Sequence, residues 1–219
     1  MRLLDEKWGI NTLSYTIVNN HYMKKNKQTD SFLKQAFVTQ TKGFVDVSQK
    51  RQIWSDFAEK TNGSFKISQT ISKDLTTYTL KIPIENGNIE FTESDTHPFK
   101  VFCEINSEKQ IEFSIAHEDF VDKFLKVFGF QDITLSHPEF DKKYLVKASD
   151  EKTVRLILNS ESVIPIILKT NIFSILSEYD KKKSKLKIMG LVGRSVNSLN
   201  EMQDVHGLFK AIIDQIKKL

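Results

Sequence analysis

The chain has 219 residues, of which 39% are hydrophobic and 27% are charged. This composition is typical of a globular protein with one large domain or two small ones, and it excludes a chain that is disordered throughout. The single cysteine, Cys103, excludes an intramolecular disulfide and a cysteine-rich zinc site.

The formal net charge of +4 is unevenly distributed along the chain. Residues 1–50 hold 8 basic and 4 acidic side chains, residues 51–150 hold 12 and 17, and residues 151–219 hold 12 and 7. The middle of the chain is therefore acidic, and arginine is rare among the basic residues. Because specific recognition of nucleic acid relies on a continuous basic surface and on bidentate arginine, we expect none here.

No apolar run approaches the roughly 20 residues that span a bilayer. The stretch WGINTLSYTIV (8–18) is interrupted by polar residues and follows two acidic ones, which is atypical of a secretory signal. We therefore expect a cytoplasmic protein. Residues 1–47 are expected to form a poorly defined lead-in, followed by an α+β domain over 48–219 that is either undivided or split into sub-domains at 48–128 and 129–219.

The first clear signal predicts a helix over residues 48–60. Trp54 and Phe57 fall on one face at helical spacing. Ser48 is the expected N-cap, and Gly63 follows the expected end.

Alternating apolar and polar residues then predict several strands. The expected strands are 64–70, 76–84, 85–91, 98–106 and 109–117. The Asn86-Gly87 step predicts a hairpin between the second and third, and Ser107-Glu108 predicts another between the last two. The arrangement expected is an antiparallel meander with one covered face, with Cys103 as a small core residue.

The second half of the chain predicts alternating helices and strands. In order, these are an amphipathic helix over 118–129, strands at 131–135 and 142–148, a helix from about Asp150, an apolar segment beginning near Pro165, and a hairpin of 171–179 with 185–193.

The final helix carries the strongest pattern. Ser198 and Glu201 form a capping box. After them apolar residues recur at alternating intervals of three and four: Met202, Val205, Phe209, Ile212, Ile216 and Leu219. We expect this stripe to pack on the sheet, with a homodimer seam as the alternative.

Three residues could form a metal-dependent, nuclease-like site. Asp132, Asp141 and Lys143 follow a D-x8-D-x-K pattern, in which two acids hold a divalent cation and a lysine positions the attacking water. Asp141 and Lys143, two apart on a strand, would project from the same side. Such triplets also arise by chance in a lysine-rich chain, and we favour a solvated strand-to-helix face, with no catalytic residue assigned.

The remaining motifs do not predict a metal or cofactor. His97 and His137 each precede proline, His117 begins a predicted helix, and none has the spacing of a preformed metal site. The segment GLVGRS (190–195) is not a phosphate-binding loop or a nucleophile elbow, and no base is apparent for Ser195.

The stretch FDKKYLVKASDEKTVRLILNSESVIPIILK (140–169), with IWSDFAEKTNGSF (53–65) upstream, resembles a group of uncharacterised bacterial proteins. In that group an F-[DN]-K-x-Y/F-x-V strand runs into a helix with an acidic start. The residues that carry the resemblance here are Phe140, Asp141, Lys142, Tyr144, Val146, Asp150, Glu151, Ile157 and Leu158. The group has no established activity, so the resemblance implies a strand-to-helix unit and no site residue.

The sequence thus predicts an α+β fold, with antiparallel sheet flanked by amphipathic helices and a long C-terminal helix packed on the sheet. The function that we expect is a non-enzymatic binding or interaction module. One alternative is a metal-dependent hydrolase that uses Asp132, Asp141 and Lys143. Another is a binder of a small apolar ligand, which the 16 phenylalanines suggest.

Overall fold

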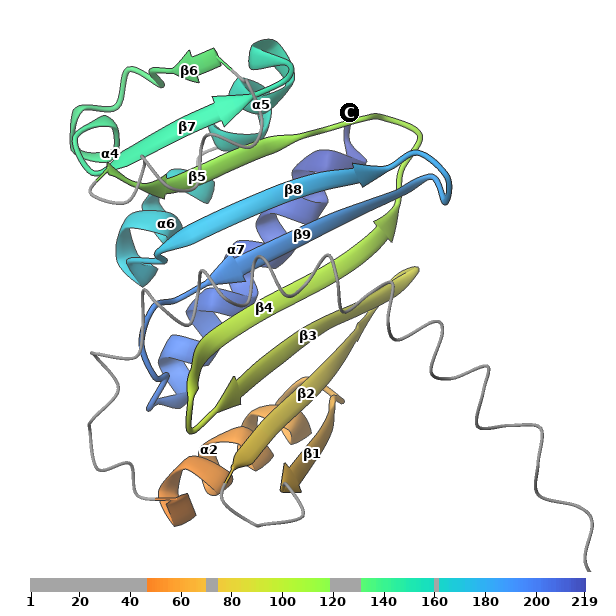
Figure 1. The fold of residues 1–219 in the computed structure, drawn as a ribbon, viewed down its shortest axis with the longest axis vertical. Helices are drawn as coiled ribbons and strands as arrows, with labels where there is room; N and C mark the ends of the chain where they lie inside the picture. Colours follow the sequence, from red (N-terminus) through yellow and green to blue (C-terminus); the bar gives the residue numbers. More distant parts are fainter. Residues whose placement is uncertain (1–46, 70–74, 119–130, 160–161) are drawn as a thin grey trace, which may run out of the picture. The chain divides into compact units, whose positions relative to one another are not determined.

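The structure, a computed structural model, describes residues 47–69, 75–118, 131–159 and 162–219. The described strands form one antiparallel sheet in the order β1-β2-β3-β4-β9-β8-β5-β7-β6 (Figure 1). They are β1 Ser64–Gln69, β2 Thr76–Ile84, β3 Gly87–Ser94, β4 His97–Asn106, β5 Phe113–His117, β6 Gln131–Ile133, β7 Tyr144–Ala148, β8 Ser174–Asp180 and β9 Lys185–Leu191. The helices are α2 Val47–Lys60, α4 Pro138–Asp141, α5 Glu151–Leu158, α6 Val163–Thr170 and α7 Leu199–Lys217.

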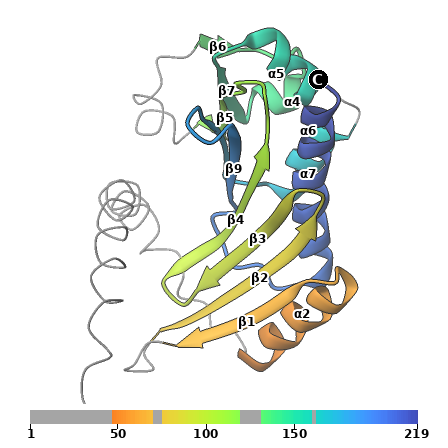
Figure 2. The same ribbon diagram turned by 90° about the vertical axis from the view of Figure 1, so that its right-hand side faces the viewer.

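The helices α2, α5, α6 and α7 lie on one face of the sheet (Figure 2). The long helix α7 contacts the other three, so it joins them into one layer. Between this layer and the sheet lies a core of large apolar side chains, many of them aromatic. Its largest fully buried members include Trp54, Tyr78, Phe57, Phe91, Phe99, Phe113, Phe140 and Phe209. The predicted α+β class is confirmed.

The stripe on α7 packs onto the sheet, as predicted. The buried residues of this helix are Met202, Val205, Leu208, Phe209, Ile212, Ile213 and Ile216. Phe209 lies against Gly190 of β9, where a Cβ atom would come within 2.3 Å of its Cζ atom. The absence of a side chain at Gly190 therefore allows α7 to approach the sheet closely. The apolar stripe that a homodimer seam would use is buried within the chain.

The prediction that β4 and β5 form a hairpin is wrong. β4 pairs with β3 and β9, and β5 pairs with β7 and β8, so the β8–β9 hairpin lies between them. Cys103 and Ile105 of β4 pair with Ile188 and Leu186 of β9, which places apolar residues beside apolar residues. This match of buried side chains outweighs the short connection that had suggested a hairpin.

The predicted helix ends and turns are confirmed with small shifts. The Asp150 carboxylate caps α5 by accepting from the N–H groups of Lys152 and Thr153, and the Ser198 hydroxyl caps α7. α2 begins at Val47, before the expected cap. Its end is marked by Asn62, whose φ of 52° is left-handed, rather than by the glycine that follows.

The turn between β2 and β3 occupies Glu85 and Asn86, one residue earlier than the Asn-Gly step suggested. Asn86, the second residue of this turn, has a positive φ of 69°, a conformation that asparagine tolerates well. β8 and β9 form the final hairpin that the sequence predicted. Cys103 is buried, and burial raises the pKa of its thiol to about 12, as suits a core residue.

Residues 1–46 lie outside the described residues, and so does the helix predicted over 118–129, apart from Glu118. Strands from both halves of the remaining chain enter the same sheet, because β5 pairs with β7 and β8. None of the helices in the described part of the chain combines the length and the apolar composition of a membrane-spanning segment.

Candidate functional site

The structure gives Asp132, Asp141 and Lys143 separate local roles. Asp141 ends α4, and its two carboxylate oxygens accept from the N–H groups of Leu135 and His137, each at 2.9 Å. It therefore closes the turn that leads into α4. Lys143 lies in the turn before β7, so it does not share a strand with Asp141 as the sequence had suggested.

Asp132 pairs with a different lysine. It lies on β6 opposite Lys147 of β7, and Lys147 Nζ is 3.2 Å from its Oδ1. The Asp132 side chain is 65% exposed, so this is a surface ion pair. Among the residues that the structure describes, no group of three or more His, Cys, Asp or Glu side chains could hold a metal ion. The hydrolase alternative stays a hypothesis from sequence.

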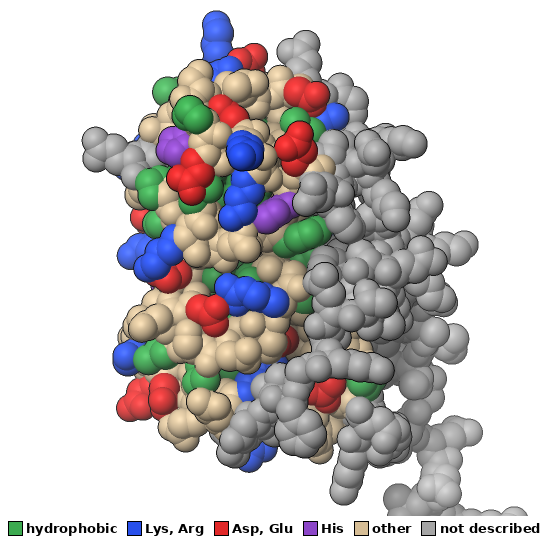
Figure 3. Space-filling view, turned by 90° about the vertical axis from the view of Figure 1, so that its left-hand side faces the viewer, with side chains coloured by type: hydrophobic (Ala, Val, Ile, Leu, Met, Phe, Trp, Pro, Cys, Tyr) green, Lys and Arg blue, Asp and Glu red, His purple; other side chains and the backbone are tan. Residues whose placement is uncertain are grey.

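An open depression of about 350 Å³ lies beside α4 and includes one of these candidates. It is lined by His117, Glu118, Glu139, Lys142 and Lys143, a set of mixed charge. The phenylalanine lining that an apolar ligand would need does not occur there. Figure 3 shows Lys and Arg side chains interspersed with Asp and Glu over the described part of the face that it draws, without a large patch of one sign.

His117 serves the packing beside this depression. Its ring meets Tyr144 edge-on, with centroids 4.6 Å apart, and stacks on Phe173 at 5.7 Å. The Tyr144 hydroxyl donates to the carbonyl of Ile172 at 2.9 Å, and burial raises the pKa of Tyr144. The rings of Tyr144 and Phe173 thus hold the ring of His117 by aromatic contact.

A polar cluster that the sequence did not predict joins the buried Lys50 and Glu93 to the partly buried Ser195. Lys50 Nζ lies 2.6 Å from Glu93 Oε1, and the two side chains are 6% and 3% exposed. The Ser195 hydroxyl donates to the same Oε1 at 2.5 Å, and Lys50 Nζ lies 3.4 Å from Ser195 Oγ. Lys50 also lies over the ring of Tyr78, 5.0 Å from its centroid.

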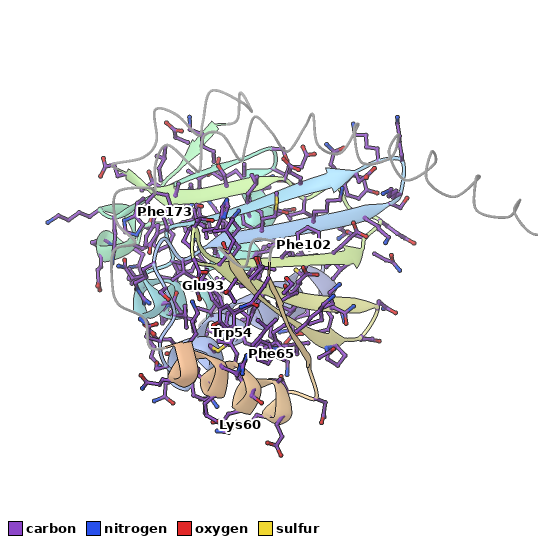
Figure 4. All side chains as sticks on the ribbon, turned by 60° about the horizontal axis from the view of Figure 1, so that its bottom comes forward. Trp54, Lys60, Phe65, Glu93, Phe102 and Phe173 are labelled. Atoms are coloured by element: carbon purple, nitrogen blue, oxygen red, sulfur yellow. The ribbon has the colours of Figure 1, made fainter. Side chains whose placement is uncertain are left out.

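Each residue of this cluster comes from a different element. Lys50 lies in the first half of α2, one turn before the buried Trp54. Glu93 lies near the end of β3, where the register with β4 shifts between Thr92 and Ser94. Ser195 lies in the connection from β9 to α7. The cluster therefore links a helix, the sheet and a connecting segment. Figure 4 shows Glu93 on the side of α2 that carries Trp54.

Burial raises the pKa of the Glu93 carboxyl, while Lys50 and the Ser195 hydroxyl act to lower it. The inference that no base is available to Ser195 is wrong, because its hydroxyl donates to Glu93. A base within hydrogen-bond reach is one requirement of a serine nucleophile. The Glu93 charge, however, is already paired with Lys50, which is the arrangement of a structural ion pair.

The edge strand β1 is the second feature of interest. It pairs with β2 over six consecutive positions, from Ser64↔Lys81 to Gln69↔Thr76, without a bulge. Its other side pairs with none of the described strands. Two apolar residues of β1, Phe65 and Ile67, are only partly buried against the core. An edge strand of this kind presents backbone groups that no described strand pairs, beside partly exposed apolar surface.

Comparisons with known proteins add no further constraint. No protein-family model matches the chain, and neither does any curated protein or any solved structure. The candidate sites therefore depend on the geometry alone.

Proposed function

We propose that the described domain is a non-enzymatic interaction module that accepts an extended strand along the outer edge of β1. The observation that carries this proposal is the regular six-residue pairing of β1 with β2, with no described strand on the other side. Adding a strand to such an edge supplies main-chain hydrogen bonds for affinity and side-chain contacts for specificity.

The register indicates which backbone groups face outward. The two-residue turn makes Ile84 and Gly87 a hydrogen-bonded pair. Bonding alternates along an antiparallel ladder, so Lys81, Thr79 and Thr77 direct their N–H and C=O groups toward β1. Their partners on β1 are Ser64, Lys66 and Ser68. The outward groups of β1 therefore belong to Phe65, Ile67 and Gln69.

Pro83 agrees with this assignment. Pro83 lies two residues after Lys81 on β2, so the backbone groups of both residues point toward β1. The nitrogen of Pro83 carries no hydrogen and could not donate to β1. The ladder between the two strands ends at Ser64↔Lys81, two residues before Pro83. No ladder bond is lost there, as is usual for proline in a strand.

The side chains beside this edge would add apolar contact with an incoming strand. The Phe65 ring packs against Trp54 at 5.8 Å and Tyr78 at 6.2 Å between centroids, yet part of it stays accessible (Figure 4). Ile67 lies two residues further on the same side. A strand with apolar residues at alternate positions would cover both.

β1 lacks several features that protect an edge strand from unwanted pairing. It has no proline and a single charged side chain, Lys66. It also pairs with β2 without a bulge. These features support β1 as the edge that is used for binding.

A peptide selection tests the proposal. Random peptides displayed on phage are selected against the full chain, and their binding is then measured with Ile67→Pro, which removes the outward N–H, and with Ile67→Val, which keeps it. We expect alternating apolar peptides that bind the wild type and Ile67→Val, and that bind Ile67→Pro at least tenfold more weakly.

Amide hydrogen exchange gives a second readout that needs no variant. Bound peptide should slow the exchange of the Phe65, Ile67 and Gln69 amides, because these N–H groups then donate to the peptide. Peptides that leave these three amides unchanged, or a selection against the monomeric chain that yields no binder, would contradict the proposal.

A further inference from the structure

We infer that the strand accepted by β1 is β1 of a second copy of this chain, so that two sheets join edge to edge about a two-fold axis. This inference rests on the proposed function, since it names the partner for the same edge. An antiparallel pair of identical strands is self-complementary, because each backbone row offers alternating donors and acceptors.

The outward groups of β1 select the position of the axis. An axis through Ile67 places Ile67 opposite Ile67 of the second copy, and Phe65 opposite Gln69. All three residues whose backbone groups point outward are then paired. Residues that pair lie on the same face of the joined sheet, so the partly exposed Phe65 and Ile67 of the two copies form one continuous apolar row.

The charge on the opposite face agrees with the same axis. Lys66 is the single charged residue of β1, and it is exposed. With the axis at Ile67, Lys66 lies opposite Ser68 of the second copy. With the axis moved by one residue to Lys66, the two lysines would face each other directly, and like charges in that position are destabilising.

This pairing also closes the assembly. Each copy contributes the same edge once, so two copies use both of the β1 edges that are available. Among the described strands, the edge left at each end of the joined sheet is β6, a different strand that cannot repeat the contact between two β1 strands. A dimer is therefore expected, and not a fibre.

The test uses charges at position 68, because Ser68 is exposed in one copy and lies opposite Lys66 of the other. The dissociation constant of the full chain is measured by sedimentation equilibrium for the wild type, Ser68→Glu and Ser68→Lys. We expect a wild-type dimer, with about two- to tenfold tighter association for Ser68→Glu and a similar weakening for Ser68→Lys, since each dimer contains two such cross-strand pairs.

A charge-swapped variant is the matched control. Lys66→Ser combined with Ser68→Lys has the composition and net charge of the wild type and places serine opposite lysine again, so its dissociation constant should return to that of the wild type. A dimer that is indifferent to these charges has its contact elsewhere and overturns the inference. A monomer that still binds selected peptides at β1 also overturns it but leaves the proposed function in place, whereas a monomer that binds no peptide contradicts both.

Discussion

Lys50 and Glu93 form an ion pair at 2.6 Å in which both side chains are more than nine-tenths buried. Removing one partner of such a pair leaves a charge in the core without compensation. The pair joins α2 to β3 and, through Ser195, to the connection before α7. Its effect on stability is therefore open to direct measurement.

Lys50→Met should lower the free energy of unfolding by about 3 kcal/mol, because Glu93 loses its cation while its desolvation remains. Urea denaturation at neutral pH measures the change. Lys60→Met, at an exposed position of the same helix, is the matched control and should change the free energy of unfolding by less than about 0.5 kcal/mol. Equal effects of the two variants would mean that the buried pair contributes no more to the free energy of unfolding than an exposed lysine does.

The pH dependence of stability should reveal the titration of Glu93. Burial raises the pKa of its carboxyl above the ordinary value of 4.5. From pH 4.5 to the folded pKa, the folded chain holds a proton that the unfolded chain has lost. The free energy of unfolding therefore falls as pH rises through this window. Glu93→Gln removes this titration, whereas the other carboxyl groups titrate in both proteins.

The measurement is the difference in free energy of unfolding between wild type and Glu93→Gln, followed upward from pH 4.5. As pH rises, the free energy of unfolding of the wild type should fall relative to that of Glu93→Gln. A shift in the opposite direction would show that the attraction of Lys50 outweighs the cost of burial and that the pKa of Glu93 is lowered in the folded chain.

Helix caps and turns of this chain could be predicted from the sequence, because the contacts that form them join residues only a few positions apart. Asp150 caps α5 and Ser198 caps α7 through N–H groups two or three positions away. Asn86 accommodates the positive φ of its turn by itself. Each of these contacts depends on short-range geometry, which a sequence pattern records.

The order of the strands in the sheet could not be predicted from the sequence in the same way. The short connection between β4 and β5 suggested a hairpin, but β8 and β9, more than 60 residues later, pair between them. Nothing in the alternation of β4 distinguishes β5 from β9 as its neighbour, since all three strands offer buried apolar residues. Pairing depends on how the whole set of strands fills the sheet.

The buried cluster left one signal in the sequence. Glu93 has the same phase on β3 as the buried Ile89 and Phe91, so it points into the core. An acid on an apolar phase predicts a buried partner. The partners could not be named, because Ser195 is 102 residues away from Glu93 and 145 from Lys50.

Asp141 and Asp132 should differ sharply when each is changed to alanine. Asp141→Ala removes the acceptor of two backbone N–H groups and should cost about 1–3 kcal/mol. Asp132→Ala removes a surface ion pair and should cost less than about 1 kcal/mol. Thermal unfolding with and without Mn²⁺ checks both expectations. A stabilisation by Mn²⁺ that both variants abolish would instead support the metal-dependent hydrolase.

Replacing each of two glycines, Gly190 and Gly207, by alanine should change the free energy of unfolding in opposite directions. A Cβ atom on Gly190 would lie 2.3 Å from Cζ and 2.9 Å from Cε2 of Phe209, and 3.1 Å from Cδ1 of Ile172. Gly190→Ala should therefore force α7 away from β9 and lower the free energy of unfolding by about 1–3 kcal/mol.

Gly207 lies within α7, and a Cβ atom there would meet nothing within 4 Å. Gly207→Ala should raise the free energy of unfolding by about 0.5–1 kcal/mol, because alanine loses less backbone entropy than glycine in a helix. Gly190→Ala should cost less in a Phe209→Leu background than in the wild type, since a smaller side chain makes room for the new methyl group. Urea denaturation of the wild type, the three single variants and the double variant measures these effects. If Gly190→Ala were as stable as the wild type, the close packing of α7 on β9 would be excluded.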